Sequence, residues 1–311
     1  MRQYIFKRIL MLFPMLLGIS FIAFVLVNLI PADPAEVALR INDIQPTEEA
    51  IALMREELGL DRPFFTRYLQ WLSKSTRFDF GATFTNANRT VAGEIARSLP
   101  ATLELSAAAL VIVIGSSLLL GVSCALYRDT LFDRSVRLFV FLGTAMPNYW
   151  VGLLLMWLFA LKLDLLPTSG GGGWKNLILP AVTLSLTYIS TYIRLIRNNM
   201  IENMSEEYVL YANARGLKQR TVVFGHVLRN SLHSCVTALG MSVPQLIAGA
   251  FVVENVFAWP GIGRLCISAI FNRDYPVIQA YILVMGVLFI FCNLAVDILH
   301  CFMDPRLRRS S

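Results

Sequence analysis

The sequence predicts an all-α, polytopic membrane protein with six transmembrane helices. Hydrophobic residues make up 56% of the chain and charged residues 15%, against roughly 25% charged residues in an average soluble domain. Six long runs contain no Asp, Glu, Lys or Arg, and the basic residues gather between them. Charge placed beside apolar runs is typical of membrane proteins, so the net charge of +6 does not indicate a nucleic-acid partner.

Each uncharged run is long enough for one membrane crossing, the fourth only barely. A helix of about 20 apolar residues spans a hydrocarbon core of about 30 Å. Backbone polar groups in hydrocarbon must be paired within the segment, which favours helices in every run. The runs cover residues 9–32, 105–127, 138–160, 176–193, 230–253 and 275–296.

The first run follows Arg2, Lys7 and Arg8, a pattern that also begins cleaved signal peptides. Its apolar stretch is much longer than a signal-peptide core, and no A-x-A cleavage site follows it. We therefore expect residues 1–32 to form a cytoplasmic N-terminus and a retained first transmembrane helix.

Lys and Arg counts in the short connections predict the orientation of the chain. The N-terminus, residues 128–137, residues 194–229 and the C-terminal tail carry three, three, six and three basic residues, whereas residues 162–175 and 254–274 carry two each. The richer segments alternate with the poorer ones, which places both termini in the cytoplasm.

Residues 33–100 are then expected outside, as a small helical cap, and residues 101–311 as a five-helix core. In the cap, Thr47 precedes a stretch with helical spacing that Gly59 ends, and Pro63 precedes a second amphipathic stretch.

The uncharged runs argue against an ion-coupled transporter, because such proteins usually carry buried carboxylates or histidines. Energy for uphill transport would then enter through another subunit. The chain contains no G-x-x-x-x-G-K-[ST], H-E-x-x-H or G-x-S-x-G motif. We expect no enzyme activity, no cofactor and no metal site. The three histidines (His226, His233, His300) are far apart, and no C-x-x-C pair occurs among Cys124, Cys235, Cys266, Cys292 and Cys301.

Several of the runs contain an internal proline, which removes a helix hydrogen bond and permits a kink. These prolines are Pro14, Pro147, Pro180 and Pro244. Kinked helices that carry Asn148, Tyr188 and Gln245 could line a polar pathway. Membrane helices also tolerate proline and polar side chains without such a role, and both interpretations stay open.

Residues 194–229 form the longest predicted cytoplasmic connection, and residues 205–217 predict a short helix within it. Ser205 is a suitable cap, Glu206 and Glu207 favour the first turn, and Gly216 ends the helix with Arg215 near its negative end. Tyr208, Tyr211 and Ala212 have the spacing of one helix face. These properties suit a solvated connector and a docking helix equally well.

This segment resembles the cytoplasmic signature of ABC importer permeases, E-A-A-x-x-x-G. Ala212 and Gly216 match it, while Leu210 and Tyr211 replace the Glu and the first Ala. His226-Val227-Leu228-Arg229-Asn230 looks like the H-x-L-R-N of the peptide and nickel branch of that family. That branch is also matched by Leu58–Pro63, Asp79–Gly81, Leu99–Leu105, Ala145–Trp150, Phe257–Arg264, Phe271–Gln279 and Asp304–Arg306.

The resemblance implies a type I importer permease in a bacterial inner membrane, similar above all to the B-type permease of nickel importers. Its partners would be membrane lipid, a second homologous permease, two cytoplasmic ATPases and a periplasmic binding protein. The ATPases would grip the segment of Glu206, Glu207, Tyr208, Tyr211, Ala212, Arg215 and Gly216. The substrate would be nickel, free or chelated, with a di- or oligopeptide as the alternative; a membrane enzyme or receptor is the competing class.

Overall fold

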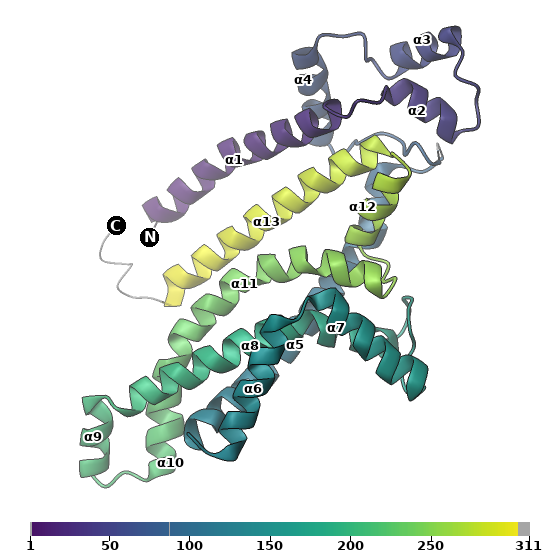
Figure 1. The fold of residues 1–311 in the computed structure, drawn as a ribbon. Helices are drawn as coiled ribbons and strands as arrows, with labels where there is room; N and C mark the ends of the chain where they lie inside the picture. The colour runs from purple at the N-terminus through teal and green to yellow at the C-terminus, as the bar shows by residue number, and fades with distance from the viewer. Residues whose placement is uncertain (1, 87, 304–311) are drawn as a thin grey trace. The chain divides into compact units, whose positions relative to one another are not determined.

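The structure, a computed structural model, describes residues 2–86 and 88–303 and is built almost entirely of helices (Figure 1). In the described part of the chain, strand-like pairing is limited to an isolated bridge between Ala82 and Thr90. The chain forms two compact units, residues 1–101 with 260–311 and residues 102–259. The all-helical fold with several apolar spans is confirmed.

In the first unit, the two terminal membrane helices lie side by side (Figure 1). They are α1 (Arg2–Asn28) and α13 (Tyr275–Met303), joined by an ion pair of 3.0 Å between Arg8 and Asp297. Gly286 permits their close approach, because a Cβ built at this position would lie 2.5 Å from Cγ2 of Ile19. The helix α12 (Ile262–Phe271) packs against α13 in the same unit.

The predicted cap helices are confirmed as α3 (Glu48–Glu57) and α4 (Phe64–Ser75). The Thr47 hydroxyl accepts a hydrogen bond from the Ala50 amide, and Gly59 has a φ of 65° after the end of α3. A third cap helix, α2 (Pro34–Ile41), was not expected. The sequence does contain a helix-start pattern here, an Asp followed by a Pro. Asp33 accepts a hydrogen bond from the Ala35 amide, and Pro34 occupies the first helical turn.

Aromatic contacts hold α4 against the C-terminal half of α1. Phe21 and Phe24 meet Phe64 and Tyr68 in mostly edge-to-face pairs, an arrangement that aromatic rings favour. The Tyr68 hydroxyl also shares a hydrogen bond of 2.8 Å with Ser20. The cap is therefore attached along the side of a membrane helix.

The second unit contains the remaining long helices, with several short helical elements among them. The helix α5 (Val91–Leu126) starts fourteen residues before the apolar run that predicted it. The other elements are α6 (Leu131–Ala145), α7 (Asn148–Leu155), η1 (Met156–Lys162), α8 (Trp174–Met204), α9 (Glu207–Ala214), α10 (Gln219–Thr221), η2 (Val222–Val227) and α11 (Leu228–Val256).

Five of the six predicted runs are helices long and apolar enough to cross a membrane, and the third is a bent pair. Residues 131–145 and 148–162 meet at an angle of 111° instead of forming one helix. Pro147 has no N–H, and Met146 before it adopts an extended conformation with ψ 138°. The helices around Pro14, Pro180 and Pro244 continue through their prolines.

The close approach of α1 and α13 predicts a position-dependent effect of side-chain volume. Gly286→Leu forces Ile19 and its helix apart and should destabilise the protein by about 1–3 kcal/mol. Gly18→Leu is the matched control, because a Cβ at Gly18 meets nothing within 4 Å. Thermal unfolding of the purified protein measures both variants, and equal midpoints would contradict the close packing.

Candidate functional site

The helix α9 lies where residues 206–216 predicted a short cytoplasmic helix, but its first residues behave differently. Glu206 is the N-cap, with extended backbone angles, and Glu207 begins the helix. Ser205 is not the cap: it ends α8, and its hydroxyl donates to the Glu202 carbonyl at 2.7 Å. The hydroxyl of Ser205 is therefore bonded to the end of α8. A capping pattern read from the residues after Ser205 does not take this preceding helix into account.

The exit from α9 matches the prediction for Gly216. Its φ of 73° is left-handed, a conformation that glycine adopts without steric cost. The Gly216 amide donates to the Asn213 carbonyl at 2.9 Å, and the Leu217 amide donates to Ala212 at 3.3 Å. These two bonds form a Schellman motif beside the exposed C-cap Arg215, so the chain turns sharply after the helix.

One face of α9 is buried in the chain's own core. Val209 and Ala212 pack in a cluster with Met200 of α8 and with Val223 and Val227 of η2, the segment that leads into α11. Tyr208 packs against the same cluster, and its hydroxyl donates to the Asn203 side chain at 3.1 Å. The inner face therefore joins α9 to two long helices.

The opposite face of α9 is open. Leu210 and Tyr211 are 71% and 66% exposed, and Glu207 is exposed on the preceding turn. The sequence predicted that Tyr208, Tyr211 and Ala212 share one contact face. In the structure Tyr208 and Ala212 point inward and Tyr211 points outward. Spacing predicts which residues lie close on a helix, but it does not say where the edge of the intramolecular core falls.

A buried ion pair near α9, absent from the sequence prediction, fixes α6 to α8. The Arg197 guanidinium donates from Nε and Nη2 to the Asp133 carboxylate at 2.7 and 2.8 Å. The Asp129 amide donates to the same carboxylate, and Arg137 lies 3.6 Å from it. Asp133 is fully buried, so these donors replace the water it has lost. The two partners are 64 residues apart, a separation that local patterns do not bridge.

The three predicted pathway residues lie on α7, α8 and α11, which contact one another. Asn148 accepts a hydrogen bond of 2.5 Å from Thr187, next to Tyr188 in the sequence. The Tyr188 hydroxyl would lie 3.9 Å from a Cβ built at Gly249 of α11. Gly249 follows the exposed Gln245 by one helical turn. Tyr192 and Ser242 share a bond of 2.5 Å between α8 and α11. Neutral polar side chains thus gather where these three helices meet, with Tyr192 itself only 3% exposed. We call this group the polar track (Asn148, Thr187, Tyr188, Tyr192, Ser242, Gln245).

In the described part of the chain, no three His, Cys, Asp or Glu side chains are grouped so that they could hold a metal ion. His226 and His233 are exposed, and the side chain of His300 lies outside the described residues, as does the motif of Asp304–Arg306. The expected lack of a resident metal stays a prediction.

The apolar helices and the short helix α9 packed on them define a multi-pass membrane protein. Residues 117–309 match the family described as "Binding-protein-dependent transport system inner membrane component", and residues 1–106 match its N-terminal counterpart. The chain belongs to this family and is a non-catalytic permease subunit of an ABC importer in the inner membrane.

Named relatives cover the full chain. It is 38% identical over 312 residues to the metal-staphylopine import system permease protein CntB of Staphylococcus aureus, with all of both chains covered. It is 37% identical to the di/tripeptide transport system permease protein DppB of Pseudomonas aeruginosa and 35% to the glutathione transport system permease protein GsiC of Salmonella typhi, with 99% of each chain covered. Permeases of this family work with another permease, ATPase subunits and a binding protein.

The buried ion pair predicts strong coupling between Asp133 and Arg197. Arg197→Ala leaves the carboxylate buried without its main partner and should cost about 3–5 kcal/mol. The double variant Asp133→Ala/Arg197→Ala should cost less than the sum of the two single variants. Thermal unfolding of the four proteins gives the coupling, and strictly additive effects would show that the pair does not interact.

Proposed function

We propose that the chain forms one half of a translocation pathway for nickel carried as an organic chelate. A second, homologous permease forms the other half, two ATPases drive it from the cytoplasm, and a periplasmic binding protein delivers the chelate. Both termini lie in the cytoplasm, in agreement with the distribution of Lys and Arg.

The polar track is the observation that carries this proposal. Its amides and hydroxyls donate and accept hydrogen bonds but carry no charge, so they hold a polar solute weakly and release it. A chelator brings its own ligands to the metal, and the protein then needs to recognise only the outer surface of the complex. The metal-staphylopine permease, similar over its whole length, supports a metal with an organic carrier.

A di- or tripeptide is the second candidate, because the polar track suits peptide amides equally well. The relatives that carry glutathione and di/tripeptides support it. The two candidates share neutral hydrogen-bonding groups, and they differ in whether the metal travels with the organic molecule.

Uptake experiments separate the two substrates. Cells that carry the complete transporter, and matched cells that lack it, receive radioactive nickel with a chelator, nickel alone, or a labelled dipeptide. We expect transporter-dependent uptake of chelated nickel that excess dipeptide does not suppress. Uptake of the dipeptide alone would replace the nickel assignment with the peptide one and leave the permease assignment intact.

The outer face of α9 is the proposed contact with the ATPase. Tyr211→Ala should leave the thermal midpoint unchanged and weaken ATPase association by roughly 2 kcal/mol or more, as for an interface aromatic. Leu131→Ala, another exposed apolar side chain outside α9, is the control. Stimulation of ATP hydrolysis by the loaded binding protein is the measurement; normal stimulation of Tyr211→Ala would make α9 a connector.

The inner face and the exit of α9 should respond differently from the outer face. Ala212→Trp overfills a buried position and should destabilise the chain by about 1–3 kcal/mol. Gly216→Val places a β-branched side chain at positive φ, at a similar cost of about 1–3 kcal/mol. Both should lower the thermal midpoint together with the stimulation of ATP hydrolysis, whereas unchanged midpoints would contradict the packing of α9.

A further inference from the structure

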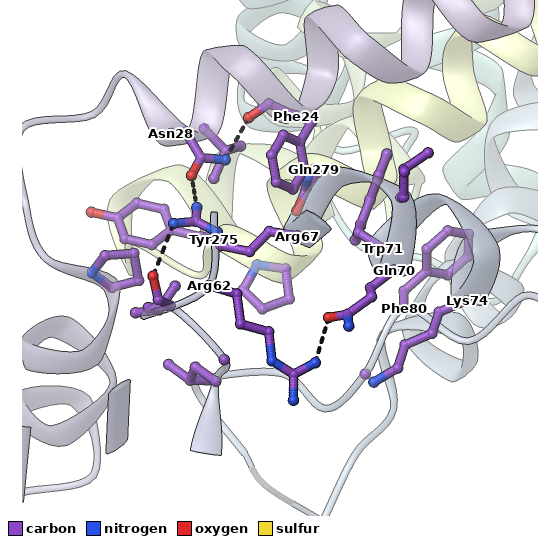
Figure 2. A pocket seen from close by; sticks show the side chains of 18 of the residues that line it. Phe24, Asn28, Arg62, Arg67, Gln70, Trp71, Lys74, Phe80, Tyr275 and Gln279 are labelled. Atoms are coloured by element: carbon purple, nitrogen blue, oxygen red, sulfur yellow. Dashed lines mark hydrogen bonds between the residues drawn. The ribbon is translucent and has the colours of Figure 1, made fainter. Parts of the chain in front are cut away.

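The first unit contains a cavity of about 780 Å³ that the transport function does not use. We call it the cap cavity. It lies between the C-terminal end of α1, the helix α4, the turns around Gly59 and Gly81, and the beginning of α13. Figure 2 shows Arg67 near Asn28 and Tyr275, with Arg62, Gln70 and Lys74 along the neighbouring wall.

Cationic side chains dominate the charge of the cap cavity. Arg62, Arg67 and Lys74 line it with a single carboxylate, Asp79, which accepts a hydrogen bond from the Gly81 amide at 3.1 Å. None of the ion pairs formed among the described residues includes these three cations. Arg62 donates to Gln70, and Arg67 donates to Asn28 and to the Leu60 carbonyl, all of them neutral acceptors.

Two further donors in the lining are buried without a hydrogen-bond partner among the described residues. They are the Tyr275 hydroxyl and the Gln279 amide nitrogen, on residues 5% and 8% exposed. A buried donor that lacks an acceptor costs about 1–3 kcal/mol. These two groups are covered by protein atoms and lie behind the surface of the wall. The three cations that line the cavity indicate a negatively charged ligand rich in acceptor oxygens.

The lining also has an apolar part, which includes the end of the candidate membrane span Arg8–Asn28. Phe24 and Val27 belong to the uncharged run of residues 9–32. Trp71 packs on Phe24 with ring centroids 5.7 Å apart, and Phe80 also lines the cavity. Ser20, which bonds Tyr68 of α4, is eight residues before Asn28, or about 12 Å deeper along the helix. Phe65 and Leu69 on α4 remain 69% and 62% exposed, as on helices that lie in a membrane interface.

We propose that the cap cavity binds an anionic phospholipid. The phosphodiester oxygens accept hydrogen bonds from Arg62, Arg67 and Lys74, and an acyl chain lies along Phe24, Val27 and Trp71. Free phosphate would leave the apolar wall without a partner. An acidic segment of a soluble protein would have to reach the end of the apolar run of α1, which is expected to lie among lipids. A lipid is therefore the favoured occupant.

Lipid binding is tested on the complete transporter reconstituted in bilayers of phosphatidylcholine with and without phosphatidylglycerol. We expect phosphatidylglycerol to raise the thermal midpoint of the wild type and to remain bound after purification. Arg62→Gln and Lys74→Gln should each lower the affinity roughly fivefold, the effect of one cation near a lipid surface. Arg77→Gln is the matched control, since Arg77 is an exposed cap cation outside the lining.

Tyr275→Phe is a structural control within the lining. Without phosphatidylglycerol, removal of a buried unpartnered hydroxyl should leave the midpoint unchanged or raise it. With phosphatidylglycerol, the lipid-dependent rise should equal that of the wild type, because the covered hydroxyl does not reach the cavity.

Three results would overturn the proposal. The first is equal retention of phosphatidylglycerol by Arg62→Gln, Lys74→Gln and Arg77→Gln. The second is a rise in midpoint with inorganic phosphate, in lipid-free detergent, as large as that with the lipid. The third is that Arg62→Gln and Lys74→Gln retain the lipid like the wild type but lose the stimulation of ATP hydrolysis by the binding protein. That result would make the cap cavity a protein-docking surface.

Discussion

The need to pair every backbone N–H and C=O inside hydrocarbon determines most of this structure. Each uncharged run satisfies that need by becoming a helix, so the spans themselves have little freedom. Variation is confined to places where a helix stops or breaks. The break before Pro147, the turn at Ser205 and the exit at Gly216 are three such places, and each one borders a group that the proposed function uses.

This constraint explains which features could be predicted from the sequence. Runs without charge mark the spans, since exclusion of charge from hydrocarbon acts on every residue of a run. Thr47, Gly59 and Gly216 mark helix ends correctly, because capping and positive φ depend on a few neighbouring residues. In the same way, Asp33 and Pro34 carried a readable signal for α2.

Features that depend on packing between distant segments could not be predicted. The pairing of Asp133 with Arg197 joins two helices, and neither residue stands out from its neighbours in the sequence. The burial of Ala212 depends on Val223 and Val227, which return to α9 only after the turn at Gly216. Similarly, Pro147 indicates a kink from its own chemistry, whereas the angle of 111° depends on how α7 packs on α8 and α11.

The contacts of α9 determine how a force applied to it would travel. Its inner face packs on α8 and on the segment that leads into α11, so α9 cannot move alone without exposing Val209, whose burial is worth about 1.5–3 kcal/mol. The same two helices carry Tyr188, Tyr192 and Ser242 of the polar track. Arg197 bonds Asp133 between these two regions and so links this end of α8 to α6. Under the proposed function, a displacement of α9 would reach the polar track along α8 and α11, the two helices on which its inner face packs.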